Sequence, residues 1–169
     1  MDGDELKQGR RARWSSFAFV VACVWIAWLS MLRLELLGWD SYPLIAAGRF
    51  ESAADWLGTL REPLMDGRYP LGHYWRPLVH YSFALDHAIW GLTPFGYHLT
   101  DVLILCANAV LLTLLASRFF VSRWCVIAGV YFAFHDVHVD VLQAPARRAD
   151  ALALMFTLLA LVTTLSFEK

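Results

Sequence analysis

The side chains best suited to acid–base or metal chemistry stand close together between residues 135 and 149. This stretch holds His135, His138 and Asp140, and two neighbouring arginines, Arg147 and Arg148, follow them. At positions i, i+3 and i+5 the first three side chains can converge at the end of a helix. There they could hold a divalent cation or orient a substrate, because imidazole and carboxylate groups serve both purposes. The spacing leaves both alternatives open.

A second polar stretch, residues 38–96, carries Asp40 and Arg76. Taken alone, an acid such as Asp40, a few residues beyond an apolar run, is typical of a solvated helix end. Three histidines in this stretch recur every seven residues: His73, His80 and His87. Two helical turns, about 10 Å, would separate successive members, which is too far to share one ion. We expect them to form a stripe that faces solvent or lipid headgroups.

The composition indicates what must position these residues. The 169-residue chain is 59% hydrophobic and 17% charged, with a mean hydropathy of +0.49. Soluble domains usually contain about 25% charged residues, so this composition favours a multi-pass membrane protein. The net charge of −1 gives the chain no overall positive potential that would attract nucleic acid. The three cysteines lie within apolar runs and are expected to pack as small hydrophobic residues.

Apolar runs predict an all-α membrane protein with about four transmembrane helices. The expected segments are a basic tail at 1–14, spans at 15–37, 97–117, 124–134 and 150–167, and a turn at 118–123. Outer loops are expected at 38–96 and 135–149. Basic residues before the first span and in the turn place the N-terminus in the cytoplasm, by the positive-inside rule. The run at 124–134 is short for a crossing, and a re-entrant segment or a buried helix is the alternative.

The long outer loop is expected to contain amphipathic helices that lie in the membrane interface. Phe50–Leu60 has a helical apolar rhythm, and a second such pattern covers Pro77–Gly91. Pro77 suits the first turn of a helix, where its missing N–H is no loss. Asp101 and Asp150 stand at the starts of the second and fourth spans. Both are interpreted as acids that the helix dipole favours.

Four motifs occur in order along the chain. They are Tyr74–Leu78 (YWRPL), Gly91–Leu99 (GLTPFGYHL), Phe134–Asp140 (FHDVHVD) and Arg148–Ala153 (RADALA). Over residues 35–160 their order and spacing resemble the N-terminal part of a GT-C-fold membrane glycosyltransferase. The likeness is greatest to the transmembrane O-mannosyltransferase-like proteins that carry tetratricopeptide repeats. Four motifs in register are more specific than any one of them.

The chain also departs from the pattern of that family. Asp136 replaces a proline, Asp140 replaces a glutamate and Asp101 replaces an asparagine. The loss of the proline puts the backbone shape of this loop in question, and the shorter side chain of Asp140 shifts its carboxylate by about one methylene. The family has many more spans than four. The resemblance therefore implies a partial GT-C fold and an N-terminal fragment of a longer enzyme.

The resemblance implies transfer of a sugar, mannose or a similar hexose, from a polyprenyl-phosphate carrier to an acceptor hydroxyl on the non-cytoplasmic face. The implied partners are this donor, a protein or glycan acceptor and membrane lipids, without nucleic acid. A divalent cation is the one cofactor that the residues leave open. The membrane would be the cell membrane or that of the endoplasmic reticulum.

The resemblance also assigns roles to single residues. Asp40 is expected to be the general base, because an acceptor hydroxyl is a poor nucleophile until its proton is removed. Asp140 is the second catalytic acid, and with His135 and His138 it would orient substrate or hold a metal. These four residues come from both outer loops.

The remaining roles concern the phosphate and the support of the site. Arg148, with Arg76 or Arg147, is expected to clamp the donor phosphate through bidentate hydrogen bonds. A role for Arg76 and Arg148 as anchors for lipid headgroups is the alternative. Asp150 is expected to fix Arg148 or to cap its helix, and Tyr97 and His98 to support the site.

Two other functions remain as alternatives at this point. A non-catalytic multi-pass subunit, or a truncated remnant, would use the same helices only to anchor or pack against a partner. A proton or ion pathway would require ionisable groups in the middle of the spans. The apolar runs contain none, because the acids and histidines gather at their ends, so the pathway is disfavoured.

Overall fold

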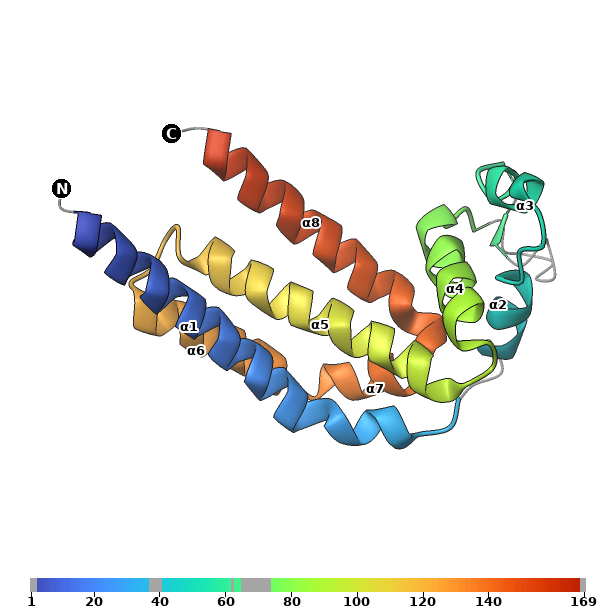
Figure 1. Cartoon of the computed structure of the whole chain (residues 1–169), viewed down its shortest axis with the longest axis horizontal. Helices are drawn as coiled ribbons and strands as arrows, with labels where there is room; N and C mark the ends of the chain where they lie inside the picture. Colours follow the sequence, from blue (N-terminus) through green and yellow to red (C-terminus); the bar gives the residue numbers. More distant parts are fainter. Residues whose placement is uncertain (1–2, 37–40, 62, 65–73, 168–169) are drawn as a thin grey trace. The chain divides into compact units, whose positions relative to one another are not determined.

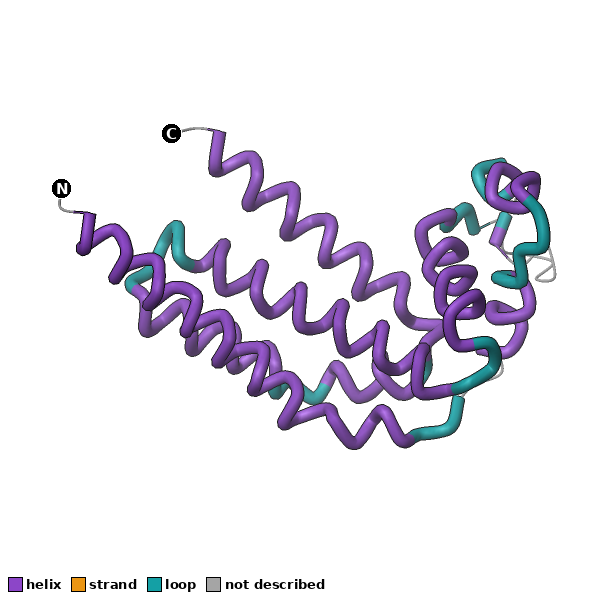
Figure 2. Tube along the Cα trace, viewed as in Figure 1, coloured by secondary structure: helices purple, strands orange, loops and turns teal. Residues whose placement is uncertain are grey.

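The protein is described here by a computed structural model of the chain, which covers residues 3–36, 41–61, 63–64 and 74–167. These ranges are helical, with loops between the helices and no strand (Figure 2). The helices are α1 (Gly3–Trp28), η1 (Leu29–Arg33), α2 (Ser41–Ala47), α3 (Ala53–Gly58), α4 (Pro77–Trp90), α5 (Pro94–Ala116), α6 (Ser122–Ala133), α7 (Val137–Gln143), η3 (Pro145–Arg147) and α8 (Arg148–Phe167) (Figure 1). The all-α fold class expected from the sequence is confirmed.

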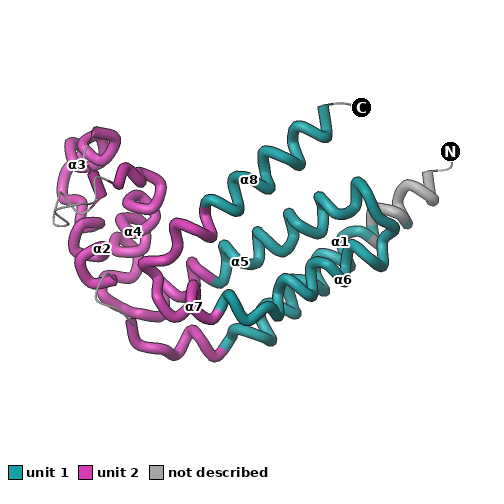
Figure 3. The backbone as a smooth tube through the Cα atoms, turned by 180° about the vertical axis from the view of Figure 1, so that it is seen from behind, with its two compact units in different colours: residues 1–29, 102–138, 153–169 teal, residues 30–101, 139–152 magenta. Residues whose placement is uncertain are grey.

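The chain divides into two compact units (Figure 3). Unit 1 comprises Met1–Leu29, Val102–His138 and Ala153–Lys169, and unit 2 comprises Ser30–Asp101 and Val139–Leu152. Unit 1 therefore holds most of the long apolar helices. Unit 2 holds the short helices and the starts of α5 and α8.

In unit 1, α1 packs along α6, and a glycine allows the close approach. A Cβ placed on Gly129 of α6 would lie 2.1 Å from the Oγ1 atom of Thr113 and 3.2 Å from Val20. Val20 is fully buried. The absence of a side chain at Gly129 thus brings α1, α5 and α6 together at one level.

At the end of α6 two side chains donate hydrogen bonds to backbone carbonyls. The Nε1–H group of Trp28 donates to the carbonyl oxygen of Ala133 at 2.7 Å. His138 donates from Nε2 to the carbonyl oxygen of Phe132 at 2.7 Å. The carbonyls in the last turn of a helix have no hydrogen-bond partner within the helix, and these two side chains donate to two of them.

In the part of the chain that the structure describes, three helices are long and apolar enough to cross a membrane: Arg13–Arg33, Pro94–Ala116 and Pro145–Phe167. Helices α6 and α7 make a fourth candidate if the two form one broken span. Large apolar side chains on α8, such as Phe156 and Leu159, are exposed. In an integral membrane protein such side chains face lipid.

In unit 2, an aromatic cluster joins α3 to α4. Trp56 and Tyr81 stack with ring centroids 5.6 Å apart, and Phe50 meets Trp56 edge-on at 4.9 Å. The hydroxyl of Tyr81 also donates to the carbonyl of Trp56 at 2.5 Å. Helix α4 begins at Pro77, as the sequence predicts. In the Phe50–Leu60 stretch, whose rhythm is helical, the helix itself covers Ala53–Gly58.

The turn between α4 and α5 depends on two glycines and a tyrosine. Gly91 ends α4 with a φ of 59°, which glycine adopts at little cost. A Cβ on Gly96 would lie 2.0 Å from the ring of Trp90. The Tyr97 hydroxyl then donates to the carbonyl of Gly91 at 2.7 Å. The motif Gly91–Leu99 therefore has a local structural reason: it builds this turn.

The stretch 135–149, expected as an outer loop, contains α7 and η3. Helix α6 covers Ser122–Ala133, whereas the sequence predicts a span at 124–134. After a short break the chain continues as α7, whose axis is bent by 52° from that of α6. A search for charge-free runs does not detect such a break.

Candidate functional site

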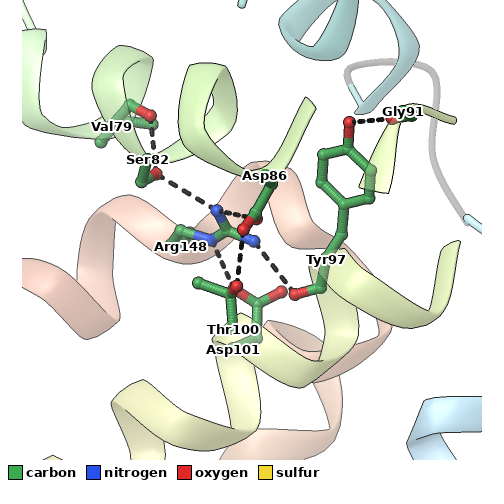
Figure 4. Close-up of polar contacts among 8 residues, drawn as sticks. All are labelled: Val79, Ser82, Asp86, Gly91, Tyr97, Thr100, Asp101 and Arg148. Carbon is green, nitrogen blue, oxygen red and sulfur yellow. Dashed lines mark hydrogen bonds and ion pairs between the residues drawn. The ribbon is translucent and has the colours of Figure 1, made fainter. Parts of the chain in front are cut away.

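A buried ionic group in unit 2 is centred on Arg148, the first residue of α8. Its guanidinium pairs with Asp101 of α5, with Nε and Oδ1 2.5 Å apart. It also pairs with Asp86 of α4, with Nη1 and Oδ2 2.7 Å apart. Arg148 is fully buried, and the two aspartates are 4% exposed or less. Figure 4 shows this Arg148 cluster, in which one guanidinium joins three helices.

Polar neighbours occupy most of the remaining hydrogen-bonding positions. Thr100 donates from Oγ1 to Oδ1 of Asp86 at 2.6 Å. The guanidinium also donates to the hydroxyl of Ser82 at 3.2 Å and to the carbonyl oxygen of Tyr97 at 3.0 Å. All three of its nitrogen atoms are therefore engaged within the protein (Figure 4).

The Arg148 cluster holds one cation and two carboxyl groups. Burial raises the pKa of Asp86, because it removes water from the carboxylate; the nearby charge of Arg148 and the hydrogen bond from Thr100 act in the opposite direction. Among the described residues, no group hydrogen-bonds Oδ2 of Asp101, which is buried. The ring of Phe83 lies 4.6 Å from the guanidinium carbon and covers one face of the cation.

Beside the cluster, a short segment presents an exposed acid and an exposed arginine. Asp140 and Arg147 pair at 3.3 Å, and their side chains are 71% and 58% exposed. His98, which is fully buried, donates from Nδ1 to the carbonyl oxygen of Leu142 at 2.9 Å. The segment is thus held by His98 near its start and by the buried Arg148 at its end. It brings together two of the expected site residues, Asp140 and Arg147.

The other expected residues lie apart from this segment or outside the described ranges. Asp40, the expected base, is outside the residues that the structure describes. Arg76 is exposed, and its guanidinium carbon lies 4.8 Å from the ring centre of Tyr74. Asp150 is exposed in the first turn of α8.

His135 and His138 belong to unit 1 and have local partners. Nδ1 of His135 lies 3.1 Å from the carboxylate of Asp136. His138 is 7% exposed and bonded to the backbone of Phe132. Over the described ranges, no three His, Cys, Asp or Glu side chains are gathered as a metal ion requires. The structure therefore supplies no geometry for the metal-binding alternative.

Arg148 and Asp101 differ most from their expected roles. Arg148 was expected to face a phosphate, but its guanidinium is buried and already paired. Asp101 was expected as a helix-dipole acid. It lies seven residues after Pro94, beyond the first turn of α5, and instead binds Arg148.

Sequence reasoning missed Asp86, Ser82 and Thr100. One signal was available for Asp86: it is the one carboxylate within the largely apolar and aromatic pattern of Pro77–Gly91. A charge in such a pattern requires a buried partner of opposite sign. The sequence does not say which of its many arginines that partner is.

Comparison with known proteins gives relatives of one kind. Protein O-mannosyl-transferase Tmtc1 of Drosophila melanogaster is 32% identical over 147 residues, which are 82% of this chain and 17% of that protein. Protein O-mannosyl-transferase TMTC2 of Homo sapiens is 39% identical over 89 residues, 52% of this chain and 11% of that protein. Protein O-mannosyl-transferase Tmtc2 of Drosophila melanogaster is 36% identical over 93 residues.

No family profile matches the chain, and no solved structure does. The chain spans less than a fifth of the length of the three relatives described above. The resemblance that the four motifs indicate is confirmed by these relatives. By sequence, this integral membrane chain is a relative of the TMTC protein O-mannosyl-transferases and matches a limited part of their length.

Proposed function

We propose that this chain is the N-terminal part of a membrane glycosyltransferase. The reaction is transfer of a hexose, mannose or a close analogue, from a polyprenyl-phosphate carrier to an acceptor hydroxyl. The observation that carries the proposal is the 32% sequence identity with protein O-mannosyl-transferase Tmtc1 of Drosophila melanogaster, which extends over 82% of this chain. The basic residues at the N-terminus and in the turn at 118–123 support a cytoplasmic N-terminus, with the chemistry on the opposite face.

The geometry of unit 2 supports this proposal through the segment that carries Asp140 and Arg147. Catalysis benefits when reacting groups are held in place by a rigid shell. Here the carbonyl of Leu142 is bonded to buried His98, and Arg148 is locked between two aspartates. The exposed pair is therefore presented from a segment with one buried anchor within it, at Leu142, and a second directly after it, at Arg148.

Arg147 and Arg76 are the arginines of unit 2 that we assign to the donor phosphate. Both are exposed, whereas Arg148 is buried and serves as a positioning residue. A phosphate leaving group needs cationic stabilisation as its negative charge develops. The phosphate would replace Asp140 as the partner of Arg147 and leave that carboxylate free to orient the acceptor. Asp40 is retained as the general base that takes the proton of the acceptor hydroxyl.

The test uses the full-length protein that carries this chain, in membranes supplied with polyprenyl-phosphate mannose and a serine- and threonine-containing peptide. Asp40→Asn should reduce transfer by about 10²–10⁴-fold, the usual effect of removing a general base. Asp140→Asn and Arg147→Gln should also reduce transfer. Asp136→Asn is the matched control, because its side chain is 96% exposed. If Asp40→Asn and Asp140→Asn both transfer at the rate of the unmodified protein, the chain is a non-catalytic membrane subunit.

A further inference from the structure

Unit 1 contains a cavity of about 310 Å³ that the proposed reaction does not use. Three helices line it: α1 contributes Arg13, Ser16 and Phe17, and the ends of α5 and α6 contribute most of the rest. Arg13 begins one candidate membrane span, and another ends at Ala116, one residue before the lining residue Ser117. The cavity therefore lies where apolar helix gives way to polar chain, at the level expected for lipid headgroups.

The inner end of the cavity is closed by close packing. Arg13, Ser16, Phe17 and Val20 share one face of α1, because residues three, four and seven apart lie on one side of a helix. Val20 is fully buried against the position of Gly129, and Thr113 lies there too. A ligand must therefore enter from the rim, where Arg13 is exposed.

The charge of the cavity favours an anion. Among the described residues that line it, Arg13 is the one charged residue, and none of them carries a carboxylate. The hydroxyl groups of Thr113 and Ser117 donate to backbone carbonyls of α5, so an anion in the cavity would be held by Arg13 and not by these two hydroxyls. The first turn of α6 adds to the positive potential, since it starts at Ser122 and its N-cap Val121 offers no side-chain cap.

The surroundings of the rim favour a lipid as the source of that anion. Phe120, which lines the cavity, and its neighbour Phe119 are 63% and 66% exposed. Trp124, in the first turn of α6, is 53% exposed. Exposed aromatic rings beside a cation are typical of the membrane interface, where acyl chains continue from the headgroup.

We propose that this cavity binds the phosphate of an anionic phospholipid headgroup, with Arg13 as its main ligand. The guanidinium donates hydrogen bonds to the phosphate oxygens, and the acyl chains leave past Phe119 and Phe120. The site is independent of the proposed transfer reaction. It depends on contacts within unit 1 alone, so its test succeeds or fails whatever the outcome for Asp40.

The test measures thermal unfolding of the purified chain in detergent micelles, titrated with phosphatidylglycerol or with phosphatidylcholine of the same acyl length. Phosphatidylglycerol should raise Tm saturably, and phosphatidylcholine should do so much less, because its choline cation opposes Arg13. Arg13→Gln should weaken the apparent Kd for phosphatidylglycerol about tenfold, the effect of losing one charge-assisted interaction. Because the side chain of Arg13 is exposed, Arg13→Gln should fold as the unmodified chain does, and circular dichroism checks this.

Arg11→Gln is the matched control. It removes the same charge from the same helix, but Arg11 is exposed and does not line the cavity, since two residues correspond to about 200° of rotation. Arg11→Gln should leave the Kd within about twofold. Equal weakening by both variants would mean diffuse attraction and would overturn the proposal. A Tm that does not change with phosphatidylglycerol would also overturn it. The same holds if millimolar inorganic phosphate alone reproduces the Arg13-dependent rise in Tm.

Discussion

Replacing Arg148 by methionine tests whether the Arg148 cluster holds unit 2 together. The change removes the contacts to Asp101 at 2.5 Å and to Asp86 at 2.7 Å, and the bond to the Tyr97 carbonyl. It leaves two buried carboxyl groups without their cation. Breaking a buried ion pair in this way usually costs about 3–5 kcal/mol, because a buried charge is left uncompensated. We expect Arg148→Met to lower the free energy of unfolding by at least this amount.

The neighbouring arginine provides the control for this prediction. Arg147 pairs with Asp140, but both side chains are more than half exposed. Surface pairs contribute about 0–1 kcal/mol, so Arg147→Met should have a small effect on the free energy of unfolding. Unfolding in mixed micelles with increasing sodium dodecyl sulfate, followed by tryptophan fluorescence, measures both variants under the same conditions.

A third protein separates lost charge balance from lost packing. In the triple variant Arg148→Met, Asp86→Asn, Asp101→Asn, no buried charge remains, and replacing a whole buried ionic group is often close to neutral. The triple variant should therefore recover at least about 2 kcal/mol over Arg148→Met. The reasoning is refuted if Arg148→Met costs no more than Arg147→Met, or if the triple variant is no more stable than the single one.

Three further predictions concern stability and pH. Gly129→Ala should lower the free energy of unfolding by about 1–3 kcal/mol through overpacking, since its Cβ would lie 2.1 Å from Oγ1 of Thr113. Adding Thr113→Ala to the same protein should restore part of this loss in the micelle unfolding assay. Gly91→Ala should lower the free energy of unfolding by about 1 kcal/mol or more in the same assay, because its φ of 59° and ψ of −121° form a backbone conformation that residues with a Cβ rarely adopt. The pKa of Asp86 is raised by burial, so the folded protein binds this proton more tightly than the unfolded chain does. The contribution of Asp86 to the free energy of unfolding should therefore fall as the pH rises from 3.8 through the raised pKa. Unfolding curves measured at a series of pH values should show this fall in the unmodified protein and not in Asp86→Asn.

Local signals in the sequence predicted the helices that depend on local causes. The charge-free runs indicated the long apolar helices, and Pro77 marked the start of α4. These features depend on residues within one helical turn or one span. They can therefore be read without knowledge of the rest of the chain.

The Arg148 cluster depends on residues that are far apart in the sequence. Asp86 and Arg148 are separated by 62 positions, and nothing in the local pattern of either identifies the other. The interpretation of Arg148 as a phosphate ligand and of Asp101 as a dipole acid followed from local rules. Both rules are sound for exposed residues, and these two are buried. Asp40 stays a prediction, as it lies outside the described ranges.

The hydrogen bonds from Trp28 and His138 have a consequence for how the chain meets a bilayer. Helix α6 has 12 residues, about 18 Å in length, which is shorter than the roughly 30 Å of hydrocarbon. Its final carbonyls would then fall within the oily interior, where water cannot satisfy them. The indole and the imidazole take the place of that water. They satisfy these carbonyls within the protein at the point where the chain bends by 52° between α6 and α7.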